Sequence, residues 1–227
     1  MRSARFLLAL AAVVTGLAHG GAGASPVTFR FSGVIGSVHA SLGGVFAVGD
    51  AASFSLTVDA TGVPGRRGES RHYPVLDMAA RFGATDFSPG SALGPFMLVN
   101  DSPGNPALPD GLTARMLPVG GPTLAGLASG AMGVELFDLD STAFDDDSPP
   151  TSLALADFEI ARMGFDYCTQ VIVSSSSVGC TSPRSVVANI RSVEIIRVPE
   201  PASLWLASLG LLCGGWWRQR RRAGPVN

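Results

Sequence analysis

The feature that most constrains the fold is an alternation of apolar and polar residues with period two. In the stretch AASFSLTVD (51–59), the side chains that point one way are Phe54, Leu56 and Val58, and those that point the other way are Ser53, Ser55, Thr57 and Asp59. Successive side chains of a β-strand lie on opposite faces of a sheet, so the pattern predicts a half-buried strand with one face in water. VTFRF (27–31) alternates in the same way.

Further apolar stretches predict the other strands. They are PFMLV (95–99), VELFDL (134–139), LALADFEI (153–160) and SVVANIRSVEIIRV (185–198), the last forming one or two strands. The segments between them, TGVPG, FSPGSALG, NDSPGNPALPDG and DDDSPP, have the composition of turns and loops. With 28 Gly, 16 Pro and no strong helical period, we expect an all-β fold. We expect an antiparallel β-sandwich of roughly seven to nine short strands in a jelly-roll-like arrangement.

The N-terminus has the order of a secretory signal peptide. Arg2 and Arg5 precede an apolar core, Phe6–Leu17, which a small-x-small cleavage signal follows. The residues that define the predicted cleavage site are Ala22, Ala24 and Ser25. The apolar core is only about twelve residues long, which is too short for a membrane-spanning helix. We therefore expect residues 1–24 to be removed; a buried N-terminal helix is the alternative.

The C-terminus carries three elements in a fixed order. VPEP (198–201) is followed by the uncharged segment Ala202–Trp217, and then by the arginines Arg218, Arg220, Arg221 and Arg222. As a helix the uncharged segment would be about 24 Å long, which is marginal for a bilayer core of about 30 Å. We expect it to be a transmembrane helix, with the arginines inside and the body of the protein outside.

This order of elements resembles the PEP-CTERM sorting signal of Gram-negative bacteria, in which such a tail accompanies an N-terminal signal peptide. By this resemblance, the recognition motif consists of Val198, Pro199, Glu200 and Pro201. Residues 202–217 would be the transmembrane part, and the Arg-rich tail 218–227 would retain the chain in the membrane. Gln219 interrupts the arginines, and AGPVN follows them where the family usually stops sooner.

The resemblance implies a destination and partners. A membrane protease-transpeptidase of this family, exosortase, would recognise and process the tail. The protein would then be held transiently in the inner membrane, with a single span, before it reaches the cell surface or the medium. The family is linked to exopolysaccharide and biofilm formation, so exopolysaccharide is a second expected partner. A permanently anchored periplasmic protein is the alternative.

The body between the two signals, residues 25–197, is long enough for one domain. It has ten Arg, no Lys and seventeen Asp and Glu, a formal charge of about −7. Such an acidic surface repels nucleic acid, so we expect no nucleic-acid partner. Cys168 and Cys180 lie twelve residues apart and flank VIVSSSSVG. In an oxidising compartment this spacing predicts a hairpin closed by a disulfide; two free thiols are the alternative.

The acidic stretch DLDSTAFDDDSPP is the candidate metal site. Its carboxylates are Asp138, Asp140, Asp145, Asp146 and Asp147. Clustered carboxylates suit Ca²⁺, which takes six to eight oxygen ligands. The stretch lacks the glycine and the closing Glu of an EF-hand, and a solvated acidic loop with no cofactor is the alternative.

Catalytic motifs are missing from the sequence of the body. Its two histidines are His39 and His72, and His72 lies in GRRGESRHYP, which we expect to be a charged loop. The sequence has no nucleophile elbow, zinc-binding HExxH, phosphate loop or dinucleotide fingerprint. We therefore expect a non-enzymatic surface or matrix protein. The alternatives are a carbohydrate-binding ectodomain, with or without calcium, and a secreted hydrolase.

Overall fold

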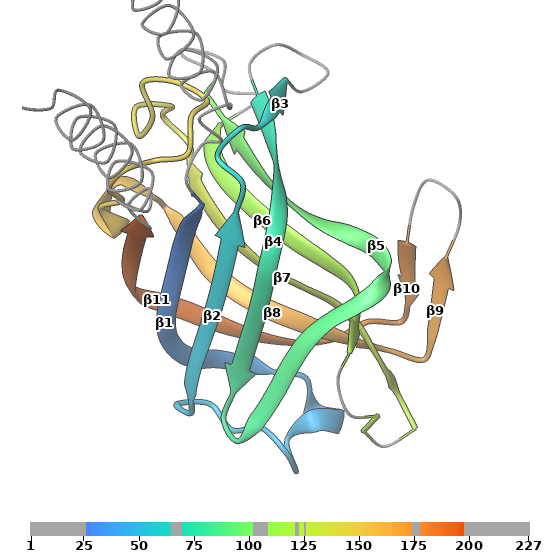
Figure 1. Ribbon diagram of the computed structural model, residues 1–227. Coiled ribbons are helices and arrows are strands. Elements are labelled where there is room, and N and C mark those ends of the chain that lie inside the picture. Colours follow the sequence, from blue (N-terminus) through green and yellow to red (C-terminus); the bar gives the residue numbers. More distant parts are fainter. Residues whose placement is uncertain are drawn as a thin grey trace, which may run out of the picture. The chain divides into compact units, whose positions relative to one another are not determined.

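The alternating segments form β-strands in the computed structural model, which describes residues 26–64, 70–101, 109–120, 123–124, 126–173 and 178–197 (Figure 1). The strands are β1 (Val27–Val38), β2 (Ala51–Val58), β3 (Val63–Pro64), β4 (Ser70–Phe82), β5 (Thr85–Asn100), β6 (Asp110–Gly120), β7 (Ala128–Asp138), β8 (Ile160–Cys168), β9 (Gln170–Val173), β10 (Val178–Thr181) and β11 (Arg184–Arg197). Two short 3₁₀ helices, η1 (Ala40–Leu42) and η2 (Leu155–Asp157), lie in the connections. The alternation in 51–58 is confirmed, because Phe54, Leu56 and Val58 are buried.

Most of the strands close into a single antiparallel barrel. Around the ring the order is β1, β2, β4, β5, β6, β7, β8 and β11, and β11 returns to pair with β1. The pairing of β2 with β4 joins the two ends of the sheet. The short β3 lies beside the start of β4, and β9 and β10 form a separate hairpin that projects beside the barrel (Figure 1).

The all-β antiparallel class is confirmed, but the predicted jelly-roll-like sandwich is corrected to one sheet that closes on itself. Closure requires a sheet to bend, and β-bulges supply bending and extra twist. Register shifts occur in the pairings of β1 with β11, β2 with β4, β4 with β5, β5 with β6 and β7 with β8. At the bulge in β1, a Cβ on Gly33 would collide with the carbonyl oxygen of Asn189, so only glycine permits this close approach.

The inside of the barrel is packed with aromatic, aliphatic and methionine side chains. Phe165 contacts four aromatic rings, with ring centroids 4.4 Å away for Phe87, 4.8 Å for Phe82, 5.1 Å for Phe46 and 5.5 Å for Tyr167. Each of these side chains is at most 3% exposed. Burial of large aromatic side chains dominates the energetics of such a core.

The two ends of the barrel are covered by different loops. We call the end at which β1 begins and β11 ends the terminal end, and the opposite end the distal end. At the distal end, the loop 39–50 places Leu42 and Phe46 in the core. At the terminal end, the loop 139–159 contributes Phe144 and the buried Phe158, whose ring centroids are 5.8 Å apart.

Three predictions of local structure were wrong. LALADFEI (153–160) is mostly a turn around η2, because the N–H groups of Asp157 and Phe158 bond to carbonyls three residues earlier rather than to a neighbouring strand. GRRGESRHYP was predicted to be a loop, but its residues from Ser70 onward belong to β4. FSPGSALG lies within β5, where bulges accommodate its Gly and Pro without ending the strand.

Candidate functional site

The terminal end brings the start and the end of the folded body together. Val27 of β1 pairs with Arg197 of β11, and the pairing continues antiparallel toward Val38. The Arg197 side chain also donates a hydrogen bond to the carbonyl oxygen of Pro149 at 3.3 Å. The predicted sorting motif starts at residue 198, so the last strand of the barrel leads directly into it.

The loop 139–159 at this end is organised around the buried carboxylate of Asp138. One of its oxygens accepts from the N–H of Asp140 at 3.0 Å, and the other accepts from the N–H groups of Thr142 and Ala143 at 2.6 and 2.7 Å. Burial alone would raise the pKa of Asp138, but hydrogen bonds from Thr142, Asp140 and Ala143 lower it below its usual value. Asp138 is thus held ionised as the anchor of the loop.

Glu159 joins two of the predicted carboxylates, although it lies outside the acidic stretch that predicted the metal site. One oxygen each from Asp138, Asp140 and Glu159 lies within 4.8 Å of the others. Glu159 also accepts a hydrogen bond from the N–H of Leu139 at 2.8 Å. Three convergent carboxylates are a donor set that suits Ca²⁺, but Asp138 already uses both of its oxygens to accept N–H groups.

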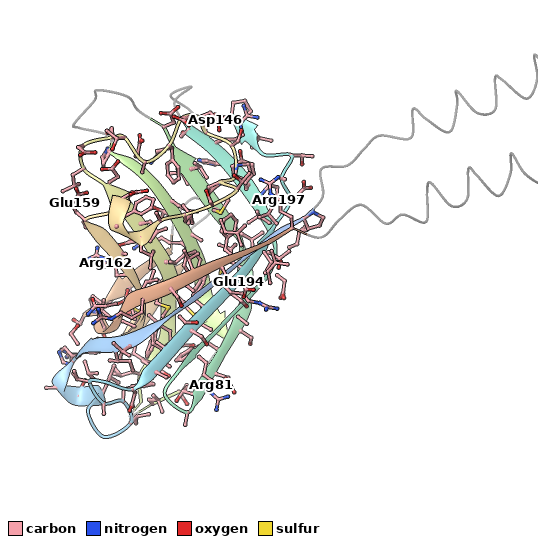
Figure 2. All side chains as sticks on the ribbon, turned by 90° about the vertical axis from the view of Figure 1, so that its left-hand side faces the viewer. Arg81, Asp146, Glu159, Arg162, Glu194 and Arg197 are labelled. Atoms are coloured by element: carbon pink, nitrogen blue, oxygen red, sulfur yellow. A yellow bond between two sulfur atoms is a disulfide. The ribbon has the colours of Figure 1, made fainter. Side chains whose placement is uncertain are left out.

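The other three predicted carboxylates lie apart from this group. Asp147 pairs with Arg71 at 3.3 Å, and its carbonyl oxygen accepts from the Tyr73 hydroxyl at 2.7 Å. Asp146 accepts from the N–H of Ser148 at 2.7 Å, and Asp145 is exposed. Figure 2 shows Asp146 and Glu159 at the same end of the barrel, with Arg81 at the opposite end.

Two further acidic residues contribute to this end, and neither lies in the acidic stretch that predicted a metal site. Asp110, at the start of β6, is fully buried and accepts from the N–H of Phe144 at 3.1 Å. Burial raises the pKa of Asp101, and the negative charges of Asp110 and Asp146 raise it further. The terminal end is therefore strongly acidic, and its loop is fixed by carboxylates that accept backbone N–H groups.

The cysteines lie at the distal end, where they tie the hairpin to the barrel. Cys168 at the end of β8 and Cys180 in β10 form a disulfide, with their Cα atoms 5.3 Å apart. β9 pairs antiparallel with β10, so the disulfide joins this hairpin to the end of β8, from which the hairpin starts. A Cβ on Gly130 of β7 would collide with the Cys168 sulfur, so glycine leaves the space that the bridge needs.

A furrow of about 260 Å³ runs along the wall of the barrel at β7, β8 and β11. Gly133 and Gly164 face each other across β7 and β8 and leave its floor without side chains. Its polar groups come from Arg115, Glu135, Arg162, Asp166 and Ser185. Arg162 pairs with Glu135 at 2.7 Å, and the Ser185 hydroxyl donates to Asp166 at 2.6 Å. The furrow thus offers guanidinium, carboxylate and hydroxyl groups side by side.

The predicted signals at the two ends of the chain lie outside the described residues. This applies to the cleavage site at Ala22, Ala24 and Ser25, to the sorting motif 198–201, to the predicted helix 202–217 and to the arginines of 218–222. Within the part of the chain that the structure describes, no helix is long and apolar enough to span a membrane.

Comparison with known proteins identifies the segment that follows the barrel. The family model of the PEP-CTERM protein-sorting motif matches residues 197–222, from the last residue of β11 to the last arginine of the cluster. No curated protein and no solved structure matched the chain. The motif implies export, processing by exosortase and sorting to the cell surface. The chain is therefore a PEP-CTERM domain-containing protein, whose sorting motif adjoins an eight-stranded antiparallel barrel.

Proposed function

We propose that the barrel is a non-enzymatic ectodomain that is displayed outside the cell and associates there with exopolysaccharide. The observation that carries this proposal is the direct junction between β11, which ends at Arg197, and the sorting motif, which matches from residue 197. The barrel is therefore what the sorting signal delivers. Its formal charge of about −7 disfavours anionic polymers such as nucleic acid.

The placement of His39 supports a structural rather than a catalytic role for this residue. Its Nδ1 lies 2.9 Å from the Ser41 hydroxyl, and its Nε2 lies 3.0 Å from the guanidinium of Arg184. A general base needs a ring nitrogen directed at its substrate. Instead, the Nδ1 of His39 contacts Ser41 within the loop 39–50, and its Nε2 joins this loop to Arg184 at the start of β11.

The furrow supports association with a polysaccharide. Sugar hydroxyls both donate and accept hydrogen bonds, so they match a lining that combines guanidinium, carboxylate and hydroxyl groups. Because Gly133 and Gly164 have no side chains, a sugar ring can approach the sheet closely at this point. We propose Arg115, which pairs with Gly133, and Asp166, two residues beyond Gly164 on β8, as residues that contact the saccharide.

The test is to compare the host with a strain that lacks exopolysaccharide. The protein from each culture is fractionated into inner membrane, surface, matrix and medium, and its C-terminal peptide is identified by mass. Under the proposal, the processed form occurs in the matrix of the wild type and shifts to the medium when the polymer is absent. An unchanged distribution would contradict the association. Full-length chains in the inner membrane would instead favour a permanently anchored periplasmic protein.

A second candidate is a carbohydrate-binding ectodomain that depends on calcium, which the convergence of Asp138, Asp140 and Glu159 favours. Titration calorimetry with CaCl₂ tests it on the mature protein from the host. Replacing Asp140 and Glu159 by Asn and Gln should abolish the heat of binding. Asp157→Asn, an exposed substitution in the same loop, should leave it unchanged. No heat of binding in the wild-type protein would refute this candidate.

A further inference from the structure

The last strand of the barrel, β11, consists of two parts that differ in the number of neighbouring strands with which they pair. From Arg184 to Asn189, β11 pairs with β8 on one side, and from Val186 onward with β1 on the other. Beyond Asn189, the only described strand that pairs with β11 is β1. The change coincides with the bulge at which Arg191 has no partner on β1. The final residues of β11 are therefore held by hydrogen bonds along one edge only.

The side chains of the first part of β11 are also more buried than those of the second part. In the first part, Val186, Ala188 and Ile190 are buried. In the second part, residues 191–197, every side chain is half-buried or exposed. Val193 and Ile195 pack partly against the core, opposite Phe31 and Phe29 of β1. A segment with little buried apolar surface and a single hydrogen-bonded edge opens locally far more often than the rest of a fold.

The polar contacts of this segment are weak. Glu194 pairs with Arg30 of β1 at 3.7 Å, and both side chains are more than half exposed (65% and 58%). Exposed pairs of this kind contribute little to stability. Arg197 adds one hydrogen bond, to the carbonyl oxygen of Pro149 at 3.3 Å. Figure 2 shows Glu194 and Arg197 on the stretch of β11 that leads to the end of the barrel.

The sorting motif follows the weakly held residues 191–197 directly in the sequence. Pro199 follows Arg197 by two residues, so an extended chain places it only about 7 Å beyond the last pair of the barrel. A membrane enzyme that takes up the motif must then work against the wall of a folded domain. Release of the seven residues 191–197 would add about 23 Å of extended chain.

We propose that residues 191–197 are a detachable end of β11, which separates from β1 to present the sorting motif to exosortase. The barrel stays closed meanwhile, because residues 184–190 remain paired and Val186, Ala188 and Ile190 remain buried. This inference goes beyond the exopolysaccharide proposal and depends only on processing of the tail. It makes the folded barrel a determinant of how fast the chain is processed.

The test locks the detachable end with a disulfide. Arg30 and Glu194 are directly opposite each other on the outside of the barrel, and facing residues of an antiparallel pair have Cα distances that a disulfide can span. The variant is Arg30→Cys with Glu194→Cys in the full-length chain in its host. Val34→Cys with Asn189→Cys is the matched control, because it joins the same two strands within the first part of β11. Peptide mass confirms each bridge.

We expect conversion of precursor to processed protein, followed by pulse-chase, to be at least tenfold slower in the Arg30–Glu194 variant and unchanged in the control. A flexible insertion of six Gly and Ser residues between Arg197 and Val198 should restore the rate in the locked variant. Equal rates in locked and unlocked chains would overturn the proposal, as would equal slowing in the control.

Amide hydrogen exchange gives an independent measurement that needs no substitution. In the unmodified mature protein, the hydrogen-bonded amides of residues 191–197 should exchange at least tenfold faster than those of residues 186–190. Equal protection of the two parts would contradict a detachable end.

Discussion

Replacing Asp138 by Asn should destabilise the protein, although the two side chains have nearly the same shape. The carboxylate accepts from the N–H groups of Asp140, Thr142 and Ala143, using both oxygens. An asparagine keeps one accepting oxygen and turns an NH₂ group toward a remaining N–H donor. A hydrogen bond to a charged group contributes about 1.5–3 kcal/mol, and a buried donor without a partner costs about 1–3 kcal/mol. We expect a loss of about 3 kcal/mol in the free energy of unfolding at pH 7.

Urea denaturation of the mature protein at several pH values measures this loss. The pKa of Asp138 is lowered in the folded state, so its contribution is present above the unfolded pKa of about 4 and is lost as the pH falls through the folded pKa. The difference between wild type and Asp138→Asn should therefore shrink at low pH. Asp157→Asn, at an exposed position, is the control. Equal stability at pH 7, or a difference that persists unchanged at pH 2, would refute the reasoning.

The remaining predictions concern the core, the disulfide and the tyrosines. Phe165→Ala removes the ring that contacts four others and should cost about 4 kcal/mol of unfolding free energy, measured by the same denaturation; a loss below about 1 kcal/mol would contradict the packing. Reduction of the Cys168–Cys180 bridge, which closes a loop across twelve positions, should cost about 3 kcal/mol, and an unchanged midpoint after reduction would contradict this. Burial raises the pKa of Tyr73 and that of Tyr167 to about 12, and the chain has no other tyrosine. The folded protein should therefore show little phenolate absorbance at pH 10.5, and its stability should fall as the pH rises from about 10 toward 12, by roughly 2–3 kcal/mol for each tyrosine. Normal titration near pH 10 in the folded state would show that the rings are not buried.

Sequence patterns predicted the strands where one face of the sheet is apolar and the other polar. The alternation in 51–59 depends only on the two-residue period of a strand, and the structure buries its apolar members. The same pattern could not distinguish a sandwich from a barrel, because both bury one face of every strand. Closure depends on bulges and on the pairing of β2 with β4, which are properties of strand pairs rather than of any single segment.

The carboxylate cluster could likewise be predicted only in part from the sequence. Asp138 and Asp140 could be predicted as candidate ligands because they are neighbours in a run of carboxylates. Glu159 reaches them only because the loop 139–159 returns to the end of β7, where its carboxylate accepts the N–H of Leu139. The apolar residues around Glu159 predicted a strand, and nothing in their spacing indicated a turn. Proximity created by a long loop has no local signal in the sequence.

The pairing of β1 with β11 has a further consequence for folding during export. Val27 and Arg197 are about 170 positions apart in the chain, so this contact has a sequence separation close to the length of the whole body. Contacts of such separation form slowly, because loop closure must be completed before they contribute any stability. Until its last strand has crossed the membrane, the body is an open sheet with β1 and β8 as unpaired edges and the aromatic core exposed. Unpaired strand edges favour aggregation, so the body is most prone to associate with other chains before β11 closes the barrel.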